Sequence, residues 1–222
     1  MRILGLDPSL ASFGWAVHET MASTRPTRCV ARGHIETSSR TLYVDRYIDL
    51  RENIRALIQE HQPDRVSQEQ PVFGEMYSEG MYGLFLFVSE AIRLEKKDVV
   101  FWTPDQIKAF ARELLDRPLV NGRKWKMTKG DMIEAAQWDT RLSDANYRKR
   151  WKNDEADAYM AAVLGGRFWD FHAGNIQASD LTPVENKQFL EVQQGKGRKR
   201  GRVIRKGTLY REDDRFFLWS QE

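Results

Sequence analysis

The first part of the chain alternates short apolar runs with turns, which predicts closely spaced β-strands. Ile3 to Leu6 is a continuous apolar run that Asp7-Pro8-Ser9 ends, as in a buried strand that runs into a turn. Residues 13–18 alternate large and small side chains, and residues 29–35 give a third run after a polar turn at 23–27. Short links between such strands favour an antiparallel meander at one side of a sheet.

From residue 43 onward, helical and strand patterns alternate. Residues 43–61 have the apolar spacing of an amphipathic helix that Pro63 stops, and residues 81–92 carry a second helical stripe. Strand-length runs follow these two helices, at 64–69 and 98–102. Because parallel strands need a crossover helix between them, this order predicts an α/β domain with a mixed five-stranded sheet flanked by helices.

Three further helices are predicted after the last of these strands. One begins at Thr103-Pro104-Asp105, where proline occupies a favoured first-turn position. Another begins near Thr128, which with Asp131 resembles a capping box that has Asp in place of Glu. The last spans about 154–169. Beyond residue 170 the chain turns polar and basic, so we expect a folded domain at 1–170 and a basic, partly flexible extension at 171–222.

Composition narrows the class of protein without identifying it. Hydrophobic residues make up 41% of the 222 residues and charged residues 30%, which is typical of a soluble globular protein. The longest apolar runs, such as Leu84 to Val88, are too short to cross a bilayer, so no membrane association is expected. The single cysteine, Cys29, excludes an internal disulfide and fits a reducing cytoplasm, where we expect the protein to act.

Four acidic residues stand where a catalytic site would form. Asp7 and Glu69 each end a strand-like run, and ligand sites gather at strand ends of α/β sheets. Asp154 and Asp157 are three residues apart at the start of a helix, which places them on one face. Singly, Asp7 is explained by a turn and Asp154 by the helix dipole. Together, the four carboxylates suit Mg²⁺, or Mn²⁺ in its place, in a two-ion site for phosphodiester hydrolysis.

Basic residues concentrate in runs with aromatic neighbours, which suits a phosphate backbone and stacked bases, although a single run is also explained by a solvated surface. Three such runs together favour nucleic acid. The expected DNA contacts in them are Arg123, Lys124, Lys126, Arg148, Lys149, Arg150, Lys152, Arg198, Lys199 and Arg200.

These motifs resemble the RuvC family of Holliday junction resolvases, within the RNase H-like superfamily. The resemblance runs in order from residue 1 to about 168. It rests on the following segments: Leu4 to Leu10 with Gly14-Trp15-Ala16-Val17, Gln62-Pro63-Asp64 leading to Glu69-Gln70, Lys129 to Ile133, and Asp154 to Ala158.

The resemblance implies an RNase H-like fold, a homodimer, and metal-dependent hydrolysis of two strands in branched DNA. It assigns metal binding and catalysis to Asp7, Glu69, Asp154 and Asp157, and it implies that Lys129 assists at the scissile phosphate. Phe73 and Tyr77 compete for the role of an aromatic inserted at the junction centre, and a core aromatic is the alternative.

The chain also departs from the family pattern. Ser9 replaces the usual Gly, the segment from Arg117 to Lys126 is longer and more basic, and the extension after residue 170 has no counterpart. These departures resemble phage-borne members, in which case the protein would act in the host cytoplasm. They favour branched DNA in general, forks and flaps included, over strict selectivity for four-way junctions.

Three alternatives remain open on the sequence. One is another RNase H-like nuclease that acts on RNA, and a second is a branched-DNA-binding protein without catalysis. The third is an actin-like phosphotransferase, for which the chain is short and lacks further glycine-rich phosphate loops.

Overall fold

The computed structural model describes residues 1–20, 28–70, 79–116, 125–140, 151–190, 192–194, 203–205 and 208–210. Five strands form the predicted mixed sheet, in the spatial order β3-β2-β1-β4-β5. The β1–β2 and β2–β3 pairs are antiparallel, whereas β1–β4 and β4–β5 are parallel. The five-stranded mixed sheet is therefore confirmed, with the bounds β1 Arg2–Asp7, β2 Ser12–Glu19, β3 Arg28–Glu36, β4 Arg65–Glu69 and β5 Val99–Trp102.

The extension adds strands that the sequence patterns do not predict. β8 (Thr208–Tyr210) pairs antiparallel with β5, so the sheet gains a sixth strand at that edge. β6 (Val192–Gln194) and β7 (Val203–Arg205) pair with each other in a separate two-stranded sheet. Three-residue strands are too short to show a period in the sequence, which is why they were missed.

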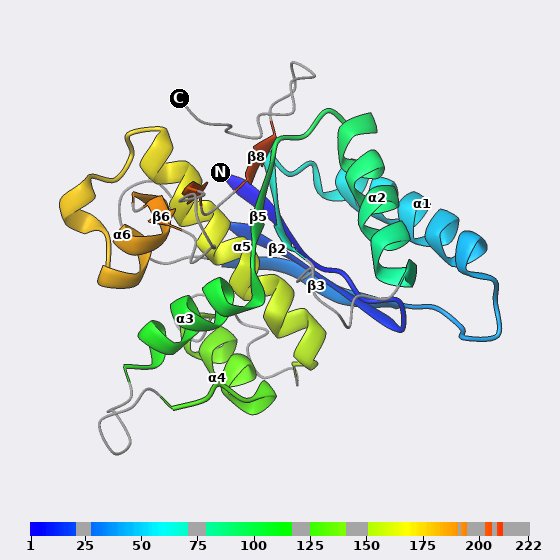
Figure 1. The fold of residues 1–222 in the computed structure, drawn as a ribbon, viewed down its shortest axis with the longest axis horizontal. Coiled ribbons are helices and arrows are strands. Elements are labelled where there is room, and N and C mark those ends of the chain that lie inside the picture. Colours follow the sequence, from blue (N-terminus) through cyan, green and yellow to red (C-terminus); the bar gives the residue numbers. More distant parts are fainter. Residues whose placement is uncertain are drawn as a thin grey trace.

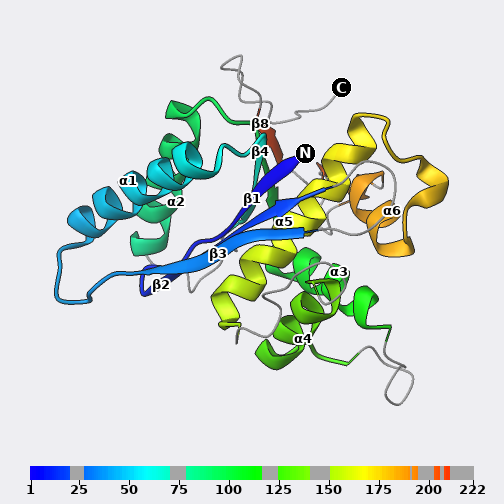
Figure 2. The ribbon, with the colours of Figure 1, turned by 180° about the vertical axis from the view of Figure 1, so that it is seen from behind.

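Helices cover both faces of the sheet (Figure 1). α1 (Tyr43–His61) and α2 (Glu79–Leu94) pack together on one face. α5 (Asn153–His172) crosses the other face, with α3 (Pro104–Leu115) and α4 (Lys129–Thr140) beside it (Figure 2). None of the helices in the described residues combines the length and apolar character needed to cross a bilayer.

The predicted starts of α3 and α4 are both capped by side-chain hydrogen bonds. The Thr103 hydroxyl accepts from the Gln106 amide while the Gln106 side chain accepts from the Thr103 amide, a complete capping box for α3. At α4 the Asp131 carboxylate accepts from the Thr128 amide at 2.7 Å, and the Asp131 amide donates to the Thr128 hydroxyl at 3.3 Å. These bonds fix the start of each helix by satisfying amides that have no partner within it.

Alternate residues of β1 face opposite sides of the sheet, and this alternation decides on which side the Asp7 carboxylate lies. Leu4 and Leu6 pack under α1 and α2. Gly5 faces α5, because an added Cβ would lie 2.0 Å from the Ala158 carbonyl oxygen. Asp7, two residues on, therefore shares the α5 face. Cys29 is buried in the core on that side of the sheet.

Part of the extension packs on the nuclease fold. The Glu185 carboxylate, on α6 (Pro183–Phe189), accepts two hydrogen bonds from the Arg167 guanidinium of α5, at 2.7 and 3.0 Å. The Gln188 amide donates to the Gln106 carbonyl of α3 at 2.9 Å. α6 is preceded by the 3₁₀ turn Ala178–Asp180. The division of the chain at residue 170 stays a prediction.

Candidate metal centre

Asp7 and Glu69 lie side by side at the ends of two neighbouring parallel strands. Leu6 of β1 is in register with Gln68 of β4, so the two acids each follow one residue after that pair. Both strands run in the same direction, and their carboxyl ends meet at one edge of the sheet, where α/β proteins place ligands. The backbone thus brings together two carboxylates that are far apart in the sequence.

α5 supplies the second pair of carboxylates. Asp154 lies in its first turn and Asp157 one turn further on. The helix start is pressed onto β2, because a Cβ at Gly14 would lie 2.1 Å from the Asp154 carbonyl oxygen. Gly14 is in turn the register partner of Asp7. The first turn of α5 is therefore held beside the end of β1.

Burial and neighbouring acidic charges raise the pKa values of Asp7, Glu69 and Asp157. Burial raises the pKa of Asp7 well above its usual value, and the charges of Glu69, Asp157 and Asp154 raise it further. Burial and then the Asp157 charge raise the pKa of Glu69 to about 7. Burial, with a contribution from Asp154, raises the pKa of Asp157 to about 6. The four predicted acids therefore form one electrostatic cluster.

Two lysines oppose this repulsion. Lys129, at the exposed start of α4, lowers the pKa values of Asp7 and Asp157. Lys108, on α3, lowers those of Glu69 and Asp157. Sequence reasoning found Lys129 and missed Lys108. The available signal was a lysine between Ile107 and Phe110, inside the apolar stripe of a helix, where a charged residue needs a partner.

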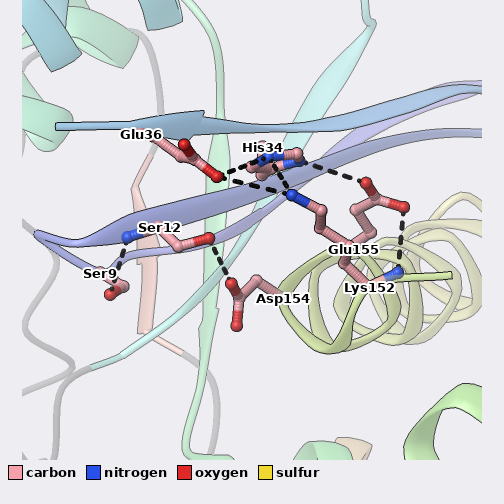
Figure 3. Close-up of polar contacts among 7 residues, drawn as sticks. All are labelled: Ser9, Ser12, His34, Glu36, Lys152, Asp154 and Glu155. Carbon is pink, nitrogen blue, oxygen red and sulfur yellow. Dashed lines mark hydrogen bonds and ion pairs between the residues drawn. The ribbon is translucent and has the colours of Figure 1, made fainter.

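The donor set suits a divalent cation, although it does not form a closed cage. Within the part of the chain that is described, no three His, Cys, Asp or Glu side chains are grouped so that they could hold a metal ion. Asp154 instead accepts a 2.5 Å hydrogen bond from the Ser12 hydroxyl (Figure 3). Buried carboxylates that repel one another are what Mg²⁺ or Mn²⁺ neutralises. A cation would have to draw these side chains together.

The expected DNA contacts are only partly placed. Lys126 is exposed just before α4. Lys152 is exposed at the start of α5, and its ammonium contacts His34 and Glu36 of β3. The remaining predicted contacts lie outside the described residues: Phe73, Tyr77, Arg123, Lys124, Arg148, Lys149, Arg150, Arg198, Lys199 and Arg200.

Sequence comparison finds a likeness to RuvC endonucleases over about half of the chain. Residues 3–111 match the profile of the crossover junction endodeoxyribonuclease RuvC. The chain is 38% identical over 76 residues to the RuvC of Gloeobacter violaceus, which covers 34% of this chain and 43% of that one. With the RuvC of Caulobacter vibrioides it shares 41% identity over 69 residues, or 31% and 40% of the two chains. The chain thus spans about half the length of the curated relatives it matches, or less.

Structure comparison extends the likeness in fold to most of the chain. The RuvC of Thermus thermophilus superposes with a TM-score of 0.60 at 17% identity, covering 79% of this chain and 98% of that one. A second structure, T. thermophilus RuvC in complex with Holliday junction substrate, gives 0.59 at 16% identity, covering 73% and 91%.

The order of the sheet and its flanking helices is thus that of an RNase H-like fold. Residues 3–111, just under half of the chain, match the RuvC family model. The relatives named here are bacterial, and the expected likeness to phage-borne members is not borne out.

Proposed function

We propose that this protein is a divalent-metal-dependent endonuclease that hydrolyses phosphodiester bonds in branched DNA. The observation that carries the proposal is the cluster of Asp7, Glu69, Asp154 and Asp157 at the strand ends of a RuvC-like fold. Burial and neighbouring acidic charges raise the pKa values of Asp7, Glu69 and Asp157. The relatives that match are named crossover junction endodeoxyribonucleases. A nuclease fits this family better than an actin-like phosphotransferase does.

The four acids would hold Mg²⁺, with Mn²⁺ as a substitute. When bound, the cations supply an activated water and charge neutralisation at the phosphate. Asp7 and Glu69 would hold the cations from the sheet, while Asp154 and Asp157 would close the site from α5. Ser12 would share Asp154, since one carboxylate has lone pairs for both a hydroxyl and a cation.

Lys108 and Lys129 would act on the phosphate side of the site. They lie on different helices and both lower carboxylate pKa values in the cluster. Lys129 is exposed at the start of α4, so its ammonium can reach an incoming phosphate. We assign to these lysines the stabilisation of charge on the scissile phosphate.

A second copy of the chain would dock on α1 and α2. Large apolar side chains remain exposed there, and we name them the α1–α2 patch. The start of α2 adjoins α1, where the Tyr47 hydroxyl donates to the Gly80 carbonyl at 2.9 Å. A symmetric dimer would present two metal centres, one for each of two equivalent strands of a four-way junction. The patch consists of Leu42, Tyr43, Val44, Ile48, Tyr82 and Leu86.

The exposed lysines and the basic extension would contact the DNA arms. Lys126 and Lys152 stand near the starts of α4 and α5, the two helices that contribute Lys129 and the second acidic pair. One nearby solved structure is RuvC with a Holliday junction substrate. Four-way junctions are therefore the first substrate to test, with forks and flaps as the broader set. The cytoplasm is the proposed site of action.

The test is cleavage of labelled four-way, forked and linear duplexes in Mg²⁺, in Mn²⁺ and in chelator. We expect cleavage of the branched substrates with either metal and none in chelator. Asp7→Asn should keep junction affinity and lose at least ~10³-fold in rate, because a lost metal ligand removes several kcal/mol of charge stabilisation.

Each contrary outcome identifies a different alternative. Unchanged cutting by Asp7→Asn would exclude the metal assignment. Preferred cutting of RNA would indicate another RNase H-like nuclease. Tight junction binding without any cutting by the wild type would indicate a non-catalytic branched-DNA-binding protein.

A further inference from the structure

Glu155, between the two α5 acids in sequence, is held on the side of the helix away from the metal centre. Its carboxylate is buried and lies 3.3 Å from Arg32 Nε and 3.3 Å from His34 Nδ1, both on β3. It also accepts from the Lys152 backbone amide at 3.3 Å, capping α5. Figure 3 shows Glu155 directed to β3 while Asp154 is directed to Ser12 of β2.

Arg32, which pairs with Glu155, is itself held in place by its neighbours. Arg32 and Glu155 each expose only 11% of their side chains. The Arg32 guanidinium lies 3.6 Å from the ring centroid of Trp151, which is buried and packs on Tyr159 of α5. A stacked, charge-paired guanidinium loses little further freedom when it forms its bonds. The β3 side of the contact is therefore rigid.

The register of the sheet places the anchor and the metal centre on opposite sides of α5. Gly14 of β2 is paired with Asp7 on one side and with His34 on the other. Directly opposed residues share a sheet face, so the three form a row beneath the helix start. The Asp154 backbone rests on Gly14 at the middle of this row. Glu155 contacts His34 at one end of this row, and Asp154 and Asp157 lie toward Asp7 at the other end.

This arrangement controls the rotation of α5 about its axis. Successive helix residues are about 100° apart, so a bond to Glu155 on one side fixes where Asp154 and Asp157 point on the other. A rotation of about 20° would move a carboxylate at the helix surface by roughly 2 Å. Metal and catalytic sites tolerate only about 0.5 Å of such displacement.

We propose that Glu155 is a positioning residue that, through Arg32 and His34, fixes the rotation of α5 so that Asp154 and Asp157 face Asp7. The inference rests on the proposed metal centre. It concerns a residue that neither contacts the substrate nor binds the metal. Its effect is on how tightly the divalent cation is held.

The test compares two variants that lose the same charge. Glu155→Leu removes every bond to β3, whereas Glu155→Gln retains an oxygen for Arg32 and for the helix cap. We expect Glu155→Leu to weaken Mn²⁺ binding by about 10-fold or more, as for partners that orient metal ligands, and Glu155→Gln to lie between it and the wild type. Arg32→Met should also weaken Mn²⁺ binding, although the Glu155 charge remains. Calorimetric Mn²⁺ titration of each folded variant measures this without cleavage.

A matched control removes a comparable contact from the other face of the sheet. Glu95, just after the end of α2 and 15% exposed, pairs with Arg55 of α1 at 2.8 Å. Glu95→Leu should lower the thermal midpoint and leave Mn²⁺ affinity unchanged. Mn²⁺ affinity that stays within twofold of wild type in Glu155→Leu would overturn the positioning role. The positioning role would also be overturned if Glu155→Leu and Glu155→Gln lost the same Mn²⁺ affinity and Arg32→Met lost none. That result would indicate a direct effect of the Glu155 charge.

Failure of the proposed function gives a different result. If the wild type binds Mn²⁺ but cuts no branched DNA, the nuclease proposal fails while the Mn²⁺ comparison still decides the role of Glu155. A wild type that binds no Mn²⁺ would overturn both. If Glu155→Leu does not fold, Glu155→Gln and Arg32→Met carry the comparison.

Discussion

At the scale of single residues, the acids of the proposed metal centre change their charge near neutral pH. Divalent cations bind deprotonated carboxylates, and the pKa of Glu69 is raised to about 7 and that of Asp157 to about 6. Mn²⁺ affinity should therefore fall as the pH drops from 8 to 6. Lys108 lowers both pKa values, so Lys108→Met should move this fall to higher pH. Mn²⁺ titrations across pH 5.5–8.5 measure the displacement, and an unchanged curve would contradict the placement of Lys108.

His18 is a second residue whose environment predicts a pH effect, here on stability. It is fully buried in β2, neither ring nitrogen has a hydrogen-bond partner, and burial lowers its pKa to about 3. As the pH falls, the unfolded state, in which His18 has the ordinary histidine pKa, binds a proton before the folded state does. The free energy of unfolding therefore decreases as the pH falls below 6.5. The loss amounts to about 2 kcal/mol between pH 7 and 5.

A His18→Leu variant isolates this contribution. The wild type should lose about 2 kcal/mol more unfolding free energy than His18→Leu between pH 7 and 5, measured by denaturant titration. The raised carboxylates of the metal centre act in the opposite direction, because their folded state takes up protons first. They are common to both proteins and cancel in the difference. Parallel pH curves would contradict the buried, neutral state of His18.

At the scale of elements, the glycines under α5 set how closely that helix approaches the sheet. An added Cβ at Gly14 or Gly5 would meet α5 carbonyl oxygens at 2.1 or 2.0 Å. Alanine at either position should cost about 1–3 kcal/mol of stability, because the helix must move away. Gly14→Ala displaces the turn that holds Asp154, and Gly5→Ala displaces Ala158, which follows Asp157, so both should also weaken Mn²⁺ binding. Unchanged Mn²⁺ affinity in a destabilised variant would contradict this link between helix position and metal binding.

The elements themselves could be predicted well from the sequence. The apolar run ending at Asp7 and the helical spacing in residues 43–61 reflect burial on one side, which the chain records directly. The four acids could be found because each ends a strand or begins a helix. Lys108 and the Glu155 contacts could not, because which side chains meet across α3, α5 and β3 depends on packing and register.

At the scale of the whole molecule, the α1–α2 patch predicts self-association. Ile48 and Leu86 expose 39% and 48% of their surface on neighbouring helices of the same sheet face. Charges buried there would be unpaired in a dimer, so Ile48→Glu with Leu86→Glu should convert a dimer to monomers. Sedimentation velocity measures the mass. The monomer should keep Mn²⁺ binding and lose paired cuts in a junction.

An exposed leucine outside the patch provides the control for this experiment. Leu190, which is 47% exposed after α6, becomes Leu190→Glu with the same added charge. It should leave the sedimenting mass unchanged. If the wild type sediments as a monomer, the α1–α2 patch is not a dimer interface. The proposed metal centre does not depend on this result.

The single cysteine has a practical consequence for labelling the protein. Cys29 lies on β3 with 8% of its surface exposed, inside the core beneath α5. A thiol reagent reaches such a group only when the strand opens, so the native chain is nearly inert to maleimide dyes. A cysteine introduced on an exposed helix would then carry a fluorophore at one chosen position. The wild-type background thus permits distance measurements between subunits and DNA arms by energy transfer.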